Sequence, residues 1–129
     1  VFAYRKTTFP SKDGIVIEAE LDLEKGKISD IHQEMDKYLS RRGSTQPLTM
    51  PNSGSIFKNP DGEKAGRLIE SAGLKGCRIG GASVSIKHAN FIVNKGGALA
   101  EDVIRLIKHI QVVVEEKTGV KLEQEIIVI

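Results

Sequence analysis

Six residues with polar or charged side chains, spread over most of the chain, have the chemistry to bind an anionic ligand or transfer a proton. They are Arg5, Ser55, Lys58, Asn59, His88 and Glu125. Guanidinium and ammonium groups hold carboxylates and developing enolates, whereas hydroxyl, carboxyl and imidazole groups exchange protons. Their spacing along the sequence does not bring them together, so only the fold can do so. The residue pattern alone predicts an α+β domain with a polar loop of unknown use.

The standard motifs for phosphate or metal binding are missing from the sequence. The glycines around Gly80-Gly81 do not fit G-x-G-x-x-G, and no segment reads G-x-x-x-x-G-K-[ST]. No His, Cys or carboxylate cluster has the spacing of metal ligands, so we predict no metal site. Cys77 is the single cysteine, which excludes an internal disulfide, and we expect its thiol to pack as a small apolar group. His32 and His109 fall on the polar sides of predicted helices, where we expect solvent.

The composition is that of an ordinary globular domain and excludes several classes of protein. Of 129 residues, 40% are hydrophobic and 28% are charged. Nineteen Lys and Arg residues are interspersed with seventeen Asp and Glu, a net charge of +2 that does not favour nucleic acid as a partner. No apolar run approaches the roughly 20 residues that span a membrane. We expect a single domain, residues 1–129, cut from a longer protein, because the chain opens on Val1-Phe2 and closes on an apolar run.

The first half of the chain predicts one strand and one helix. Residues 15–24 alternate between apolar side chains and mostly acidic ones, which is typical of a strand with one solvated face. Apolar residues at helical spacing then predict a helix over residues 28–42, with Ser29 as its cap. Residues 43–54 are rich in Gly, Pro and Ser and predict a loop, the kind of segment on which functional residues often lie.

The second half predicts short strands and two further helices. The strands are expected at residues 55–58, 82–86, 90–93 and 122–129, and the helices at residues 63–72 and 99–117. Gly73 and Gly119 stand where the two helices should end. Because strands and helices do not alternate regularly, we predict an α+β fold with a mainly antiparallel sheet packed by about three helices.

Two segments are specific enough in their letters to indicate a family. They read Gly54-Ser55-Ile56-Phe57-Lys58-Asn59-Pro60 and Lys87-His88-Ala89-Asn90-Phe91-Ile92-Val93-Asn94. Other matching segments are Tyr4-Arg5, Ala65-Gly66-Arg67-Leu68-Ile69-Glu70, Gly73-Leu74-Lys75-Gly76, Gly80-Gly81-Ala82-Ser83-Val84-Ser85 and Leu122-Glu123-Gln124-Glu125. In this order and spacing, the chain resembles the C-terminal domain of the UDP-N-acetylenolpyruvoylglucosamine reductase family over nearly its whole length.

The resemblance implies a cytoplasmic flavoprotein of bacterial peptidoglycan precursor synthesis, and so of cell-wall formation. In that family NADPH reduces FAD, and the reduced flavin delivers hydride to the enolpyruvyl group of a UDP-sugar to give UDP-N-acetylmuramate. Most FAD contacts would come from a preceding FAD-binding domain of the same polypeptide, which the 129 residues lack. We therefore expect the isolated domain to be inactive. No nucleic acid or membrane partner is expected, and the oligomeric state is left open.

The resemblance also implies roles for the polar residues. Ser55 would donate the proton, Arg5 would lie beside flavin and substrate with Tyr4 on the cofactor side, and Glu125 would hold or polarise the substrate carboxylate region. Lys58, Asn59 and His88 would bind substrate. Lys6-Thr7 stand where the family often has Asp-Ser, and no Tyr-rich insertion separates the first strand from the first helix. The chain thus resembles the subgroup of the family without that insertion, so another group, from residues 43–54, would cover the sugar diphosphate.

Each of these assignments has a simpler alternative. Ser55 can serve the turn after Gly54, because Ser is common in turns. Glu123 and Glu125 lie on one face of the predicted strand, and the pattern alone does not separate them. A non-catalytic module that binds nucleotide sugars, or an oligomerisation domain, is the alternative function.

Overall fold

The computed structural model describes residues 2–7 and 15–128. The chain divides into two compact units, Val1–Lys37 and Tyr38–Ile129. Each unit is described by itself below.

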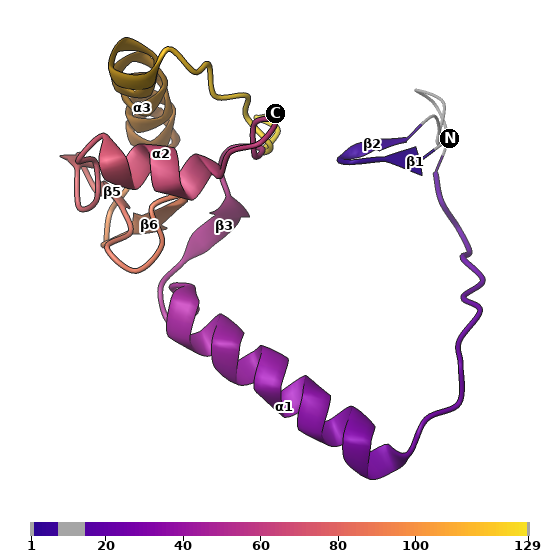
Figure 1. Ribbon diagram of the computed structural model, residues 1–129. Coiled ribbons are helices and arrows are strands. Elements are labelled where there is room, and N and C mark those ends of the chain that lie inside the picture. Colours follow the sequence, from indigo (N-terminus) through magenta and orange to yellow (C-terminus); the bar gives the residue numbers. More distant parts are fainter. Residues whose placement is uncertain (1, 8–14, 129) are drawn as a thin grey trace. The chain divides into compact units, whose positions relative to one another are not determined.

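The second unit is built on a four-stranded antiparallel sheet. Its strands are β3 (Asn52–Ser55), β4 (Arg78–Ile79), β5 (Ala82–Val84) and β6 (Phe91–Asn94), and its helices are α2 (Ala65–Ser71) and α3 (Ala100–Thr118). The strand order is β3-β6-β5-β4, with every neighbouring pair antiparallel (Figure 1). Together with α1 (Ile28–Thr45), this gives three helices and an antiparallel sheet, so the α+β prediction is confirmed.

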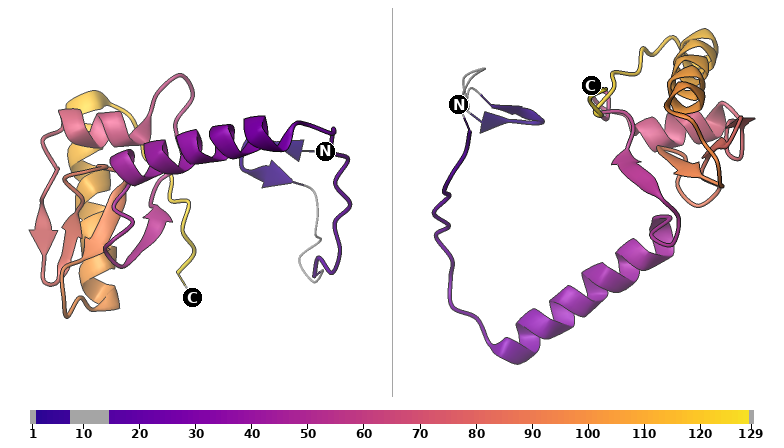
Figure 2. Two further views of the ribbon diagram at one scale, coloured as in Figure 1. Left: turned by 90° about the horizontal axis from the view of Figure 1, so that it is seen from below. Right: turned by 180° about the vertical axis from the view of Figure 1, so that it is seen from behind.

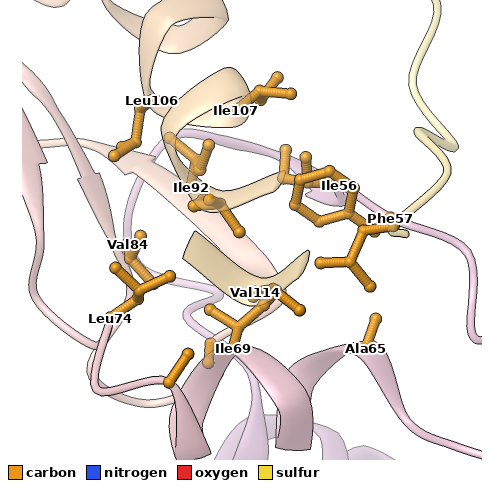
Figure 3. Close-up of a cluster of buried hydrophobic side chains, with 14 of the residues drawn as sticks. Ile56, Phe57, Ala65, Ile69, Leu74, Val84, Ile92, Leu106, Ile107 and Val114 are labelled. Carbon is orange, nitrogen blue, oxygen red and sulfur yellow. The ribbon is translucent and has the colours of Figure 1, made fainter. Parts of the chain in front are cut away.

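One face of the sheet forms the hydrophobic core with α2 and α3. Val84 and Ile92 lie directly opposite each other on β5 and β6, and both side chains are buried in this core. Directly paired residues of antiparallel strands share a face. The two helices add their apolar sides; the labelled members in Figure 3 are Ile56, Phe57, Ala65, Ile69, Leu74, Val84, Ile92, Leu106, Ile107 and Val114.

The opposite face of the sheet carries a different set of side chains. Ser83 pairs with Val93, and Ser55 pairs with Phe91, so all four point away from the helices. Ser83, Phe91 and Val93 are buried although none belongs to the core cluster. The segment that joins α1 to β3 includes the buried Pro47. The register therefore assigns Ser55 to the face that α2 and α3 leave uncovered.

The helices α2 and α3 end at the glycines that the sequence predicted. Gly73 has φ of 77° and Gly119 has φ of 72°, the left-handed conformation that ends a helix without the steric cost of a side chain. At the start of α3, the Asp102 carboxylate accepts hydrogen bonds from the backbone N–H groups of Leu99 and Gly81. These bonds lower the pKa of Asp102 and tie the β4–β5 turn to the helix.

The first unit contains little regular structure. A hairpin is formed by β1 (Phe2–Ala3) and β2 (Lys6–Thr7), with Tyr4-Arg5 at its turn. The strand predicted over residues 15–24 is wrong for the described chain, where residues 15–27 have no regular secondary structure and pair with no described strand. A strand requires a partner for its backbone hydrogen bonds. The predicted Ser29 cap is also wrong, because α1 begins at Ile28 and the Ser29 hydroxyl donates to Asp30.

The C-terminal segment returns to the end of β3, as its yellow ribbon shows in Figure 1. Gln124 forms an isolated antiparallel bridge with Phe57, in place of the strand predicted over residues 122–129. The strand predicted at residues 55–58 lies earlier, as β3. Residue 129 lies outside the described residues. Within residues 2–7 and 15–128, no helix has the length and apolar character needed to cross a membrane.

Candidate functional site

Ser55 and Glu125 are brought onto neighbouring backbone segments. The segment that follows Ser55 lies between β6 and the C-terminal segment, both visible in the left view of Figure 2. On one side, Ile56 N–H donates to Asn90 O at 2.9 Å; on the other, Glu125 N–H donates to Ile56 O at 2.8 Å. The backbone of Glu125 is thus bonded to Ile56, the residue next to Ser55, although Ser55 and Glu125 are 70 positions apart in sequence. The pairing brings the two backbone segments together. That the side chains of Ser55 and Glu125 meet in one site stays a prediction.

Ser55 is half-buried at the last position of β3. Gly54, immediately before it, has φ of 81° and donates its N–H to the Asn52 side chain at 2.9 Å. A residue with a side chain rarely adopts this conformation, so glycine at position 54 sets the direction of the chain into Ser55. The hydroxyl is therefore carried on a short, hydrogen-bonded turn at the edge of the uncovered sheet face.

The structure distinguishes Glu123 from Glu125 by their contacts, which the sequence pattern could not do. Glu123 forms an ion pair with Lys58, and its side chain is 70% exposed whereas that of Lys58 is 26% exposed. Glu125 is half-buried beside Ile56. Glu123 thus forms the ion pair with Lys58, and Glu125 is the acid whose backbone pairs with Ile56, the residue after Ser55.

Asn59 contributes to the start of α2. Its side-chain oxygen accepts a hydrogen bond from Ala65 N–H at 3.1 Å. Lys64, at the N-cap, provides no side-chain bond to the helix, so Asn59 satisfies one of the N–H groups that a helix start leaves open. Substrate binding by Asn59 stays a prediction, and the bond to Ala65 fixes where its amide lies.

His88 packs beside α2 and the sheet. Its ring makes an edge-to-face contact with Phe91, with centroids 4.9 Å apart, and a side chain at Gly66 would crowd it. Nδ1 accepts a hydrogen bond from Asn90 N–H at 3.2 Å, which requires that nitrogen to be unprotonated. Burial, and then the nearby Lys75, lower the pKa of His88 below 6.5. The described contacts therefore favour a neutral imidazole.

The lowered pKa of His88 gives stability a pH dependence. The folded state binds fewer protons at His88 than the unfolded state does, so the free energy of unfolding is expected to fall as pH drops through 6.5 toward the folded pKa. His88→Gln should flatten this slope in urea unfolding of the 129-residue chain, measured between about pH 7.5 and 5.5. His109→Gln, at an exposed histidine, is the matched control. Equal slopes for wild type and His88→Gln would contradict the assignment.

Asn90 is a positioning residue that the sequence interpretation missed. It is 4% exposed, and its side chain makes two hydrogen bonds with the backbone of Phe57. Its Nδ2 donates to Phe57 O at 2.8 Å, and its Oδ1 accepts from Phe57 N–H at 3.0 Å. The amide thereby extends the sheet pairing to the segment after Ser55. The available signal was a lone amide residue between apolar residues that are expected to be buried.

Tyr4 and Arg5 lie at the tip of the β1–β2 hairpin in the first unit. The Arg5 guanidinium lies 5.6 Å from the centroid of the Tyr4 ring, a cation–π arrangement. Arg5 has φ of 55°, a conformation that is uncommon for a residue with a long side chain and that is often associated with functional sites. Both side chains are exposed, Tyr4 by 60%. That Arg5 joins Ser55 and Glu125 in one site stays a prediction.

A groove of about 560 Å³ lies in the second unit, beside the uncovered face of the sheet. It is lined by Pro47, Thr49, Met50, Ser85, Ile86, Lys87, Val93 and Lys95. Val93 and Ser55 share a sheet face, so the groove lies on the side to which Ser55 is assigned. Lys87 donates to Gly43 O at 2.5 Å. The lining combines apolar side chains with two lysines, a surface suited to an organic anion.

Metal binding finds no support in the described part of the chain. No group of three or more His, Cys, Asp or Glu side chains there could hold a metal ion. Cys77 is partly buried and packs against the hydrophobic core, as predicted for a small apolar side chain.

Comparisons with known proteins decide the family. The model of the UDP-N-acetylenolpyruvoylglucosamine reductase C-terminal domain matches residues 46–129, which is more than half of the chain. The chain belongs to this family. A reductase from Symbiobacterium thermophilum is 50% identical over 97% of the chain and 41% of its own length. A reductase from Oceanobacillus iheyensis is 50% identical over 98% of the chain and 41% of its own length.

A solved structure of the family supports the same conclusion. The crystal structure of the UDP-N-acetylenolpyruvylglucosamine reductase from Thermus caldophilus matches with a TM-score of 0.66 and 38% identity. The match covers 81% of the chain and 37% of the Thermus protein. The chain thus spans about two fifths of the reductases that it resembles. The family prediction made from the Ser55 and His88 segments is confirmed.

Proposed function

We propose that the chain is the substrate-binding and proton-donating part of a UDP-N-acetylenolpyruvoylglucosamine reductase. The reaction converts the enolpyruvyl ether of UDP-N-acetylglucosamine into the lactyl ether of UDP-N-acetylmuramate, a peptidoglycan precursor. The observation that carries the proposal is the pairing of the segment after Ser55 with the segment of Glu125, in a chain of this family.

The reaction itself sets what these residues must do. FAD, reduced by NADPH and bound mainly by the preceding domain, would supply hydride to the terminal carbon of the enolpyruvyl group. Addition there leaves negative charge on the adjacent carbon, delocalised into the carboxylate as an enolate. That charge needs preorganised stabilisation, and the carbon then needs a proton from a group within hydrogen-bond reach.

Ser55 would provide the proton. A serine hydroxyl is a weak acid, but an enolic carbanion is a strong base, so proton transfer from serine to carbon is favourable. The half-buried position after Gly54 supports this role, because the hydroxyl is held at the edge of a face that no helix covers. A short side chain on a fixed backbone is well suited to place one proton at one carbon.

Arg5 would stabilise the enolate, with Tyr4 beside it on the flavin side. A planar guanidinium donates two parallel hydrogen bonds to a carboxylate or enolate. The exposed pair at the hairpin tip fits a planar, anionic neighbour, because both its aromatic and its cationic surfaces are accessible. Tyr4 and Arg5 are therefore the residues of this chain that would contact the flavin.

The remaining residues would bind the substrate around this centre. Glu125 would hold the carboxylate region of the substrate through a shared proton or a bridging cation, since two bare carboxylates repel. Lys58 would act from the outer side of the segment, Asn59 from the start of α2, and His88 as a neutral hydrogen-bonding group.

Glu125 offers the sharpest test of the proposed function. In the full-length enzyme, Glu125→Ala is expected to lower turnover of the enolpyruvyl UDP-sugar by about 10²-fold, because a stabilising group at the developing charge is removed. Turnover is followed as substrate-dependent oxidation of NADPH. Gln124→Ala, at the exposed neighbouring position, is the matched control and should retain activity.

The outcomes separate the proposal from its alternative. If the full-length enzyme binds the UDP-sugar in calorimetry yet never oxidises NADPH in its presence, the nucleotide-sugar-binding module is the better description. If Glu125→Ala and Gln124→Ala have equal activity, the role of Glu125 is wrong even where the reductase activity itself is observed.

A further inference from the structure

The C-terminal segment that carries Glu125 is joined to the segment after β3 by a short pairing. Phe57 and Gln124 form an isolated antiparallel bridge. On one side of this bridge, Lys58 N–H donates to Glu123 O at 2.9 Å. A pairing of this length supplies few backbone hydrogen bonds and is marginal by itself. Side chains that link the two segments are therefore expected to influence where Glu125 lies.

The ion pair between Lys58 and Glu123 makes such a link. Because Phe57 lies opposite Gln124, the antiparallel register places Lys58 directly opposite Glu123. The two residues are thus joined both through their backbones and through their side chains. Opposite charges that face each other across an antiparallel pair stabilise the register in which they meet.

Glu123 lies between a firmly held part of the segment and a loosely held one. Leu122 is 4% exposed and belongs to the hydrophobic core, and its carbonyl oxygen accepts a hydrogen bond from Gln111 Nε2 at 2.8 Å. Of residues 126–128, the first is partly buried against the core and the other two are exposed. The contact of Glu123 therefore acts where the backbone leaves the core toward Glu125.

We propose that Glu123 is a positioning residue, which holds the segment of Glu125 in place through the ion pair with Lys58. The proposal rests on the proposed function for the role of Glu125 and deepens it, because it adds a residue that acts without contacting the substrate. A displacement of about 1 Å at a catalytic group can lower a rate by about 10²-fold. A carboxylate two positions away can thus affect turnover by fixing the backbone.

Glu123→Gln in the full-length enzyme tests the proposal, because glutamine keeps the size of glutamate and removes its charge. We expect kcat for the enolpyruvyl UDP-sugar to fall about 10-fold, with KM and the reduction of flavin by NADPH unchanged. The unfolding midpoint should change little, since the Glu123 side chain is 70% exposed and such ion pairs add little stability. An unchanged kcat, a change confined to KM, or a loss of both half-reactions would overturn the proposal.

A double variant tests whether Glu123 acts through Lys58. Lys58→Met should lower kcat as much as Glu123→Gln does, and the double variant should be no slower than either single variant. Additive losses of kcat would show that the two side chains act separately and would contradict the proposal. Glu115→Gln is the matched control, because it removes the 3.4 Å ion pair of Lys121 in the same C-terminal segment. Its kcat should equal that of the wild type.

Hydrogen exchange of the full-length enzyme separates a failure of this inference from a failure of the proposed function. The amides of Lys58 and Glu125 both donate across the pairing. Without NADPH or substrate, they are expected to exchange about 2–5-fold faster in Glu123→Gln than in the wild type. Equal exchange would overturn the positioning role. Faster exchange, in an enzyme whose wild type does not turn over the UDP-sugar, would support that role and count against the proposed function alone.

Discussion

Replacing Ser55 with alanine in the full-length enzyme is expected to lower turnover by about 10²–10⁴-fold while leaving reduction of the flavin by NADPH unchanged. The hydroxyl would act only after hydride has reached the substrate, so the first half of the reaction does not require it. The alanine side chain fits the half-buried site without a new contact. The two half-reactions are measured separately, by flavin absorbance without substrate and by NADPH oxidation with it.

Ser53→Ala is the matched control for Ser55→Ala. Ser53 lies on the same strand two positions earlier and is exposed, so its replacement should leave both half-reactions intact. In deuterated solvent the wild-type product should carry deuterium at the carbon that receives the proton. Full-rate turnover by Ser55→Ala, with normal flavin reduction, would falsify the assignment of Ser55 as proton donor.

The helices were largely predictable from the sequence because their signals are local. The apolar spacing of residues 99–117 and the glycine at 119 predicted α3, which the structure places at Ala100–Thr118. Gly73 likewise ends α2 with positive φ. Apolar periodicity and a left-handed terminal residue are both properties of a short stretch of chain, so they do not depend on distant contacts.

The strands were less predictable because pairing is not local. Residues 15–24 have the clearer alternation, yet they form no strand among the described residues, whereas β3 begins at Asn52 in a segment predicted to be a loop. β3 forms because β6 provides its partner, with a register irregularity between Asn52 and Ser55. Alternation predicts which side chains share a face, but the partner strand decides whether the pairing occurs.

The candidate site was predictable as a set of residues but not as an arrangement. The family motifs pointed to Ser55 and Glu125, and the structure adds the backbone pairing that makes them neighbours. The two glutamates are distinguished by the Lys58–Glu123 ion pair, a contact between side chains 65 positions apart that the sequence pattern does not reveal. For Asn90, the sequence could indicate a buried amide but not that Phe57 is its partner in two hydrogen bonds.

Asn90 is expected to be the polar residue whose loss destabilises the second unit most. Asn90→Ala removes both partners of the Phe57 backbone and leaves an N–H and a C=O group buried without hydrogen bonds. Each such group costs about 1–3 kcal/mol, so the free energy of unfolding should fall by about 2–6 kcal/mol. Urea unfolding of the 129-residue chain measures this as a lower midpoint at unchanged slope.

Asn90→Asp distinguishes the hydrogen-bond argument from simple loss of packing. Aspartate has the shape of asparagine, but an ionised carboxylate would face the Phe57 carbonyl oxygen, which needs a donor. The buried site should therefore favour the protonated acid, which can donate to that oxygen. Relative to wild type, the destabilisation of Asn90→Asp should be large near neutral pH and shrink as pH falls toward about 4.

The pH dependence also distinguishes Asn90→Asp from a control on β6, the strand that begins directly after Asn90. Asn94 lies on β6 and is exposed, and its side chain accepts hydrogen bonds from Gly96 and Ala98 in a neighbouring turn. Asn94→Asp keeps that acceptor, so its stability relative to wild type should not improve at low pH. If Asn90→Asp behaves like Asn94→Asp, the Phe57 bonds do not hold the segment. If instead only Asn90→Asp recovers on acidification, one buried amide fixes the backbone on which Ser55 and Glu125 meet.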